Sequence, residues 1–167
     1  MDPSPALALV GKYPPSLEGR CVGILVTDGV AGDMLGQLKR AIESAGASVK
    51  IIAPKIGGVT LQDGSHLKAD AQLQGAPSVL FDAVALVISE KGCDMLMKEG
   101  AATDFVKDAF GHLKAIGWTA AAKPLLKKAG VVADGGVIEL DERHAKQFAV
   151  AAATRQWDRE PSVRTPV

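Results

Sequence analysis

Two continuous apolar runs, at residues 21–27 and 82–89, constrain the fold of this chain more than any other feature. A strand with one face in water alternates apolar and polar side chains, whereas a strand covered on both faces is apolar almost throughout. The first run is also bounded by Gly and Asp, which commonly flank strands. The sequence therefore predicts two strands in the centre of a sheet that helices cover on both sides.

The segments around these runs alternate between helical and extended patterns. Between residues 30 and 45 apolar side chains recur every three or four positions, as in an amphipathic helix, and Gly46 follows where that helix should end. Further strands are expected at residues 48–53, 115–118, 131–132 and 137–140, and an exposed hairpin at residues 60–68 around Asp63-Gly64. Further helices are expected at residues 94–114 with a break near Gly100, at residues 124–129, and at residues 142–156 after an Asp141 cap.

Strands that alternate with helices favour a parallel sheet with right-handed crossovers. We therefore expect an α/β fold, a three-layer flavodoxin-like sandwich with a mainly parallel sheet and helices on both faces. Prolines at positions 3, 5, 14 and 15 predict a proline-rich arm or linker over residues 1–19. The folded domain is expected over residues 20–157, and the tail at residues 158–167, with Pro161 and Pro166, is expected to be extended.

The charge balance argues against two classes of partner. The 19 Lys and Arg residues equal the 19 Asp and Glu residues, so the formal net charge is zero, and there is no basic block of the kind that binds nucleic acid or an anionic membrane. No apolar run approaches the roughly 20 residues that span a bilayer, and the N-terminus does not resemble a signal peptide. The sequence predicts a soluble, cytoplasmic protein that binds neither nucleic acid nor membrane.

Few side chains have the types or spacing that disulfides and metals require. Cys21 lies inside the first apolar run, where a free thiol usually packs as a small hydrophobic group. Two cysteines are too few for a disulfide framework, and His66, His112 and His144 show no zinc-type spacing. No structural metal site is expected.

Three loops follow the predicted core strands, and ligands of open parallel sheets bind beyond the carboxyl ends of the strands. The loops contain Asp28-Gly29, Glu90 and the segment Thr119-Ala120-Ala121. The first loop lacks the Gly-x-Gly-x-x-Gly spacing of dinucleotide sites, and Gly57-Gly58 is not followed by the Lys and Ser or Thr of a phosphate-binding loop. We expect these loops to share one edge of the sheet without a nucleotide-binding motif.

The loop at residues 119–122 has the small residues of a nucleophile elbow but no nucleophile. In such an elbow Ser or Cys occupies a tight turn between a strand and a helix. Alanine fills the turn here, and Thr119 is expected to serve as a turn or cap residue. At Cys93 a helix start would lower the thiol pKa, whereas neighbouring Asp94 opposes this effect. A structural role is favoured for both residues, and hydrolysis through Cys93 or Thr119 stays an alternative.

Residues 4–11 and 17–26 resemble the segment that joins the haem core of large-subunit catalases to their C-terminal domain, and residues 105–116 resemble a helix-to-strand passage of that domain. The resemblance extends from about Ser4 to Trp157. This domain belongs to the wider class I glutamine amidotransferase-like, PfpI-like superfamily, which implies a flavodoxin-like fold. The resemblance implies that the chain is an excised or separately expressed C-terminal domain of a homotetrameric, haem-dependent parent that decomposes hydrogen peroxide.

The same resemblance implies which chemistry is missing. Active PfpI-like members carry Ile-Cys-His-Gly before a helix that ends in Ala-Gly, and here the Cys, His and Gly fall on Ala120, Ala121 and Ala122. The acidic partner from the first loop has no counterpart, since Val30 and Ala31 occupy that region. No catalytic residue is therefore expected. A vestigial pocket is expected instead, formed by Asp28, Gly29, Glu90, Thr119, Ala120 and Ala121.

The resemblance also implies partners and cofactors. The partners would be the catalase core domain and the homotetramer of the parent, which the domain would stabilise, and unfolding client proteins if it acts as a chaperone-like holdase. The haem would belong to the parent, because the single tyrosine, Tyr13, lies in the proline-rich arm and cannot be a buried axial ligand. No cofactor or metal is expected in this chain. The alternative is a stand-alone PfpI-like protein with residual thiol hydrolase activity.

Overall fold

The central strands β1 (Cys21–Val26) and β6 (Ala83–Val87) lie side by side and in parallel, as the two apolar runs predict. The computed structural model describes residue 12, residues 14–141 and residues 143–164, so most of the arm expected at residues 1–19 lies outside the described residues. On the other side of β1 lie β2 (Ser48–Ala53) and the short β5 (Ala71–Gln72). Beyond β6 lie β7 (Ile116–Trp118) and β8 (Val137–Glu139), which complete a parallel sheet in the order β5-β2-β1-β6-β7-β8.

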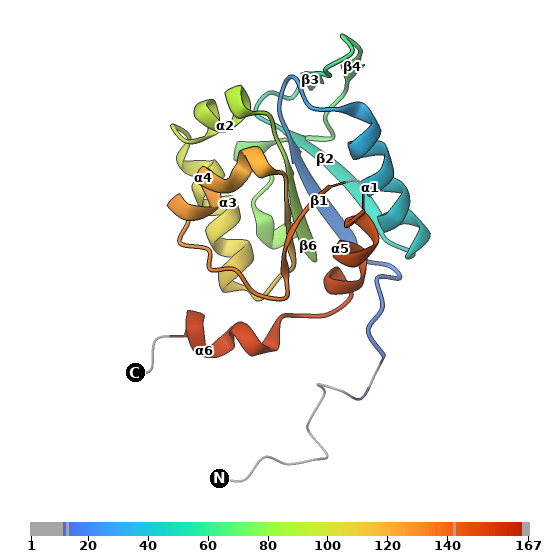
Figure 1. The fold of residues 1–167 in the computed structure, drawn as a ribbon, viewed down its shortest axis with the longest axis vertical. Helices are drawn as coiled ribbons and strands as arrows, with labels where there is room; N and C mark the ends of the chain where they lie inside the picture. Colours follow the sequence, from blue (N-terminus) through green and yellow to red (C-terminus); the bar gives the residue numbers. More distant parts are fainter. Residues whose placement is uncertain (1–11, 13, 142, 165–167) are drawn as a thin grey trace.

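Helices cover both faces of this sheet (Figure 1). One face packs against α1 (Gly32–Ser44) and α5 (Ala145–Ala152). The other packs against α2 (Glu90–Leu96), α3 (Gly100–Gly111) and α4 (Lys123–Lys128). The expected three-layer α/β sandwich is thus confirmed. None of the helices in the described part of the chain has the length and apolar character needed to cross a bilayer.

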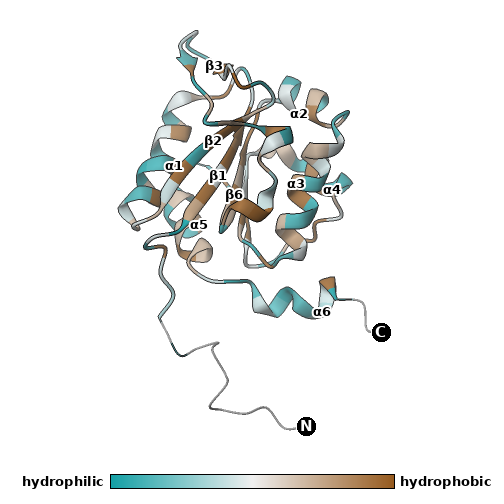
Figure 2. Ribbon diagram, turned by 180° about the vertical axis from the view of Figure 1, so that it is seen from behind, coloured by the Kyte–Doolittle hydropathy of each residue, from teal (hydrophilic) through white to brown (hydrophobic). Residues whose placement is uncertain are grey.

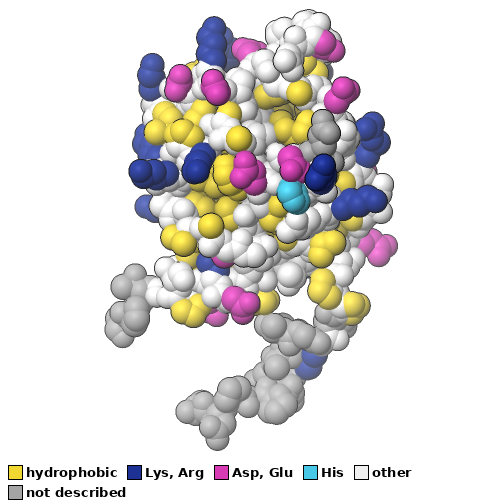
Figure 3. All heavy atoms as spheres, in the orientation of Figure 1, with side chains coloured by type: hydrophobic (Ala, Val, Ile, Leu, Met, Phe, Trp, Pro, Cys, Tyr) yellow, Lys and Arg dark blue, Asp and Glu magenta, His cyan; other side chains and the backbone are white. Residues whose placement is uncertain are grey.

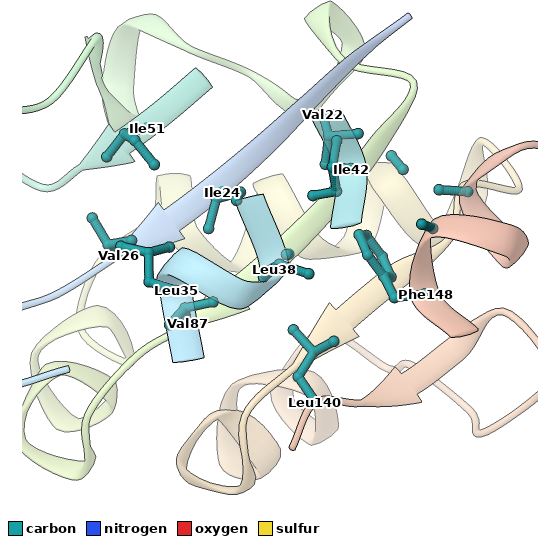
Figure 4. Close-up of a cluster of buried hydrophobic side chains, with 14 of the residues drawn as sticks. Val22, Ile24, Val26, Leu35, Leu38, Ile42, Ile51, Val87, Leu140 and Phe148 are labelled. Carbon is teal, nitrogen blue, oxygen red and sulfur yellow. The ribbon is translucent and has the colours of Figure 1, made fainter. Parts of the chain in front are cut away.

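The side chains of β1 alternate between two separate hydrophobic clusters. Val22, Ile24 and Val26 pack under α1 and α5 (Figure 4), whereas Leu25 packs under the three helices of the other face. All four are fully buried, and burying an aliphatic side chain of this size contributes about 1.5–3 kcal/mol. Figure 2 shows the result, with hydrophobic strands in the middle and both hydrophilic and hydrophobic colours on the surrounding helices.

The expected hairpin is also present, as β3 (Val59–Thr60) and β4 (His66–Leu67), which pair in antiparallel. The helical region expected from residue 94 starts earlier, at Glu90, because Ser89 caps it through its side chain. The strand expected at residues 131–132 is wrong. Val131 and Val132 follow the Gly130 turn without a strand partner, and Val132 is 66% exposed.

The C-terminal segments differ from the sequence prediction as well. The last long helix is shorter than residues 142–156, because Asp141 caps a turn through the N–H groups of Arg143 and His144 before α5 begins. The tail expected to be extended from residue 158 contains η4 (Trp157–Arg159) and α6 (Glu160–Val163). Pro161 is tolerated there because it lies in the first turn of α6, where a missing N–H breaks no helical hydrogen bond.

Candidate functional site at the carboxyl ends of the strands

The carboxyl ends of β1, β6 and β7 lie side by side, because these strands are parallel neighbours. The chain leaves them at Thr27, Ile88 and Thr119. β2 and β6 lie on opposite sides of β1, so the direction of winding changes between β1 and β6. Ligands of open α/β sheets bind at such a point, and all six expected pocket residues follow these three strand ends.

Hydroxyl groups join the ends of β1 and β6. The N–H of Ser89 donates to Thr27 Oγ1 over 3.0 Å, and Ser89 Oγ donates to the carbonyl of Asp28 over 2.7 Å. Ser89 Oγ also accepts the N–H of Gly92 over 3.0 Å, which caps the N-terminus of α2. These hydroxyls therefore hold the two strand ends and α2 together, and none of these bonds needs a ligand.

Gly92 permits this close packing. The residue is buried, and a Cβ atom at this position would overlap the side chain of Thr27. Only a residue without a side chain lets the first turn of α2 lie directly against the end of β1. The backbone of α2 thus occupies space beside the switch point.

Asp28 and Gly29 contact the β3–β4 hairpin. Asp28 Oδ1 accepts the N–H of Thr60 over 2.8 Å, and the N–H of Gly29 donates to the Thr60 carbonyl over 2.8 Å. Gly29 has a φ of 82°, which glycine adopts without strain. The first loop is therefore fixed to the hairpin.

Thr119 continues the contact between β7 and β6 by one residue. Its Oγ1 donates to the carbonyl of Ile88 over 3.0 Å and accepts the N–H of Ile88 over 3.2 Å. The chain then forms η3 (Ala120–Ala122). Among the residues that the structure describes, Leu113 is the only non-glycine with a positive φ. The turn at residues 119–122 therefore lacks the backbone strain of a nucleophile elbow.

A cavity of about 640 Å³ lies between the start of α2 and this turn. It brings together three of the expected residues, Glu90, Ala120 and Ala121, and Cys93 also lines it. The other three, Asp28, Gly29 and Thr119, do not contribute to its lining.

The charges on the cavity wall come from its two helices. Glu90 and Asp94 lie on α2, whereas Lys123 and Lys127 lie on α4. The cavity therefore has carboxylates on one side and ammonium groups on the other. Among the described residues that line it, none is a histidine that could accept a proton from a nucleophile.

The Cys93 thiol is only 2% exposed. Burial raises its pKa above the ordinary value, a backbone hydrogen bond with Leu125 opposes this effect, and the Asp94 carboxylate raises the pKa further. The thiolate is the nucleophilic form, so a thiol that stays protonated at neutral pH is a poor nucleophile.

The described residues do not fit a metal ion or a haem. They contain no group of three or more His, Cys, Asp or Glu side chains that could hold a metal. His66 and His112 are exposed, and His144 Nδ1 lies 2.8 Å from Asp141 Oδ1. No histidine or tyrosine is among the described residues that line the cavity, and the Cys93 thiol there is buried and kept protonated; Tyr13 lies outside the described residues.

Two buried charged residues, Lys114 and Arg159, are not among the residues predicted from the sequence. Lys114 is 3% exposed, and its Nζ donates to the carbonyls of Ser78 and Phe81, each over 2.6 Å. Burial is the main cause that lowers its pKa, to about 8; the charge of Arg155 lowers it further, while Asp82 and Asp108 oppose the change. The sequence signal that could have predicted this burial is the position of Lys114, between Leu113 and the apolar residues at the start of β7.

Comparison with known proteins identifies relatives for nearly the whole chain. The family described as the C-terminal domain found in long catalases matches residues 18–161. Catalase C of Rhizobium meliloti is 46% identical over 168 residues, which cover 98% of this chain and 24% of that protein. Catalase HPII of Mycobacterium avium is 36% identical over 93% of this chain and 25% of its own length. The chain thus spans about a quarter of the length of these relatives.

Solved structures show the same fold at low sequence identity. Drosophila melanogaster DJ-1beta has a TM-score of 0.68 and 18% identity, over 86% of this chain and 95% of its own. Oxidized DJ-1 of Toxoplasma gondii has a TM-score of 0.66 and 16% identity, over 78% and 86% of the two chains. At such identities the likeness concerns the fold alone.

Proposed function

This chain belongs to the family of C-terminal domains found in long catalases, and from that premise we propose that it is a non-catalytic accessory domain of such an enzyme. Its role would be to stabilise the assembled parent, a haem-dependent homotetramer that decomposes hydrogen peroxide. The haem and the peroxide chemistry would belong to the part of the parent that precedes this domain. The free thiols of Cys21 and Cys93 support a reducing compartment, the cytoplasm.

The observation that carries the proposal is the turn after β7. Ala120 and Ala121 offer only methyl groups to the cavity, and the Thr119 hydroxyl is bonded to the backbone of Ile88. Covalent catalysis needs a nucleophile beside a base that activates it. A turn that has no thiol, no base and a Thr119 hydroxyl bonded to the backbone supports an accessory role over a stand-alone thiol hydrolase. Asp28, Gly29 and Glu90 would then be remnants of a pocket.

Removal of the domain tests the proposed role. In a long catalase that ends in this chain, we expect deletion from Leu17 onward to lower the temperature at which the tetramer dissociates. Peroxide turnover per haem should stay unchanged below that temperature, because the domain supplies no group to the reaction. An unchanged dissociation temperature would contradict the stabilising role, and lost turnover in an intact tetramer would contradict the non-catalytic one.

The hydrolase alternative has its own test. Iodoacetamide should label Cys93 slowly at neutral pH in the folded chain and quickly after unfolding, because burial keeps the thiol protonated and shielded. Fast labelling in the folded chain, together with a peptidase or esterase activity that Cys93→Ser abolishes, would favour the hydrolase.

A holdase role has one supporting observation, the adjacent side chains of Val79 and Leu80, which are 62% and 61% exposed. The apolar segment Met95-Leu96-Met97 offers less surface to a client than this pair, because Met95 is 40% exposed and Leu96 is fully buried. The chain should then suppress aggregation of a heat-unfolded client at low molar ratio, and Val79→Asp with Leu80→Asp should weaken the effect. No protection at a large excess would contradict this role.

A further inference from the structure

A groove with an apolar floor runs between α1 and α5, on the face of the sheet opposite α2, α3 and α4. Its volume is about 940 Å³, and we call it the α1/α5 groove. Alanines of both helices line it. Ala41 lies in α1 and Ala45 directly follows it, whereas Ala149 lies in α5 and Ala153 directly follows it. Val150 also lines it and is 73% exposed, the most exposed of the large apolar side chains in the described residues. The groove therefore exposes apolar surface that a partner would cover.

Basic side chains border this apolar floor. Arg40, Arg143 and Lys146 line the groove and are exposed, and no aspartate or glutamate is among its described lining residues. The ion pairs formed within the described part of the chain involve other side chains. Figure 3 shows hydrophobic side chains along α5 with Lys and Arg side chains beside them. The charge pattern fits a partner with an apolar ridge and acidic flanks.

The chain itself enters at this groove. Pro15 and Leu17 form part of its wall, so the start of the continuously described chain lies beside the groove. In long catalases the matched domain is the C-terminal one and covers about a quarter of the relatives' length, so most of the polypeptide precedes it. A short arm with Pro14 and Pro15 keeps that preceding part at a high effective concentration near the groove.

We propose that the α1/α5 groove is the surface by which this domain docks on the preceding catalase core, and that the core contributes an apolar ridge flanked by Asp or Glu side chains. The inference rests on the proposed function and names its contact surface. A second copy of this chain is a poorer occupant. A twofold contact of groove with groove would bring Arg40, Arg143 and Lys146 of one copy against the same three residues of the other.

The test reverses the charges in a long catalase that ends in this chain. The triple variant Arg40→Glu, Arg143→Glu and Lys146→Glu should lower the dissociation temperature toward that of the domain deletion. Val150→Asp should do the same through the apolar floor. A control triple, Lys55→Glu, Lys98→Glu and Lys107→Glu, changes exposed lysines elsewhere and should leave the temperature nearly unchanged. Unfolding of each variant as the 167-residue chain identifies any variant that simply fails to fold.

Zero-length coupling of amines to carboxylates gives a second readout that does not depend on stability. Lys146 should couple to Asp or Glu residues of the core, and the coupled products should be lost at high salt, where the attraction is screened. Products that join Lys146 only to another copy of this domain would overturn the proposal. A dimer of the 167-residue chain that Val150→Asp separates would also overturn it, because a second copy would then occupy the groove.

The outcomes separate this inference from the proposed function. If the domain deletion lowers the dissociation temperature and the charge-reversed triple behaves like its control, the groove is not the docking surface and the stabilising role stands. If the deletion has no effect, the stabilising role fails, while coupling of Lys146 to core carboxylates would still support docking at the groove.

Discussion

Arg159 and Asp134 form a two-pronged ion pair, with Arg159 Nε 2.6 Å from Asp134 Oδ2 and Nη2 2.9 Å from Oδ1. The third nitrogen, Nη1, donates to the carbonyl of Lys114 over 2.8 Å, and the guanidinium lies 4.3 Å from the centre of the Phe110 ring. The Arg159 side chain is 1% exposed, so the protein itself compensates its charge. The pair ties η4 to the end of α3 and to the loop before β8.

Arg159→Ala should lower the free energy of unfolding by about 3 kcal/mol, because it removes a buried guanidinium together with its hydrogen bonds to Asp134 and to the carbonyls of Phe110 and Lys114. Burial alone would raise the pKa of Asp134, but the hydrogen bonds from Arg159 and Gly136 hold it below the ordinary value. Urea unfolding at neutral pH measures the change. The control is Arg164→Ala, which breaks a pair with Glu160 that is 76% exposed on the arginine side and worth about 0.5 kcal/mol or less. Equal losses in both variants would contradict the buried pair.

The buried Lys114 predicts a pH dependence above neutrality. Its pKa in the folded chain is about 8, below the 10.5 of an ordinary lysine. Between these values the unfolded chain binds a proton that the folded chain has released, so the free energy of unfolding should rise with pH in this window. Over the whole window the contribution is up to about 3 kcal/mol.

Comparison with Lys114→Met isolates this effect. The raised pKa of the Cys93 thiol acts in the opposite direction above pH 9.0, but it contributes to both proteins and cancels in the difference. The difference between the two unfolding free energies should therefore change by up to about 3 kcal/mol from pH 8 to pH 10.5. A difference that stays constant with pH would show that Lys114 titrates as an ordinary lysine.

The same glycine-to-alanine substitution should have opposite effects on stability at two positions, Gly92 and Gly36. Gly92→Ala should destabilise the chain by about 2 kcal/mol, since the new Cβ would overlap Thr27 where α2 meets β1. Gly36→Ala lies inside α1 with only ordinary contacts to Arg40, and it should stabilise by about 0.5–1 kcal/mol through helix propensity. Thermal unfolding of both variants checks the pair. A neutral Gly92→Ala would mean that α2 and Thr27 can move apart at little cost.

Ala120→Cys tests whether a thiol alone restores hydrolase activity at the turn after β7. Ala120 is exposed at the cavity, so the new thiol should react with iodoacetamide much faster than the buried Cys93. It should not hydrolyse peptides or esters, because no histidine of the described lining is positioned to activate it. Mass spectrometry of the labelled peptides distinguishes the two sites. Hydrolysis by this variant would show that the turn still has a working base beside it.

Local patterns predicted the framework of the fold. β1 and β6 are continuous apolar runs, and α1 presents Leu35, Leu38 and Ile42 at helical spacing, so each signal lies within one segment. The adjacency of Glu90, Ala120 and Ala121 follows from the expected parallel order of the strands. The two-residue strand β5 is too short to carry such a pattern, and the Val131-Val132 pair has apolar residues without a partner strand.

Contacts between distant segments were not predictable from the sequence. The carbonyls that bind Lys114 lie 36 and 33 positions before it, and Asp134 lies 25 positions before Arg159. Asp28 does not line the cavity, and its carboxylate instead accepts the N–H of Thr60 in the hairpin. In each case the partner depends on how a loop packs against the folded sheet. Secondary-structure propensity and hydrophobic periodicity are local signals, so they do not predict such a contact.

The hydroxyls of Thr27, Ser89 and Thr119 each accept a backbone N–H, from Ser89, Gly92 and Ile88 respectively. The amide hydrogens of Ser89, Gly92 and Ile88 should therefore exchange as slowly as those of the central strands, although these residues lie beyond the strand ends. Around these three hydroxyls, the end of the sheet that enzymes of this architecture keep open to incoming molecules continues the hydrogen-bonded interior of the chain.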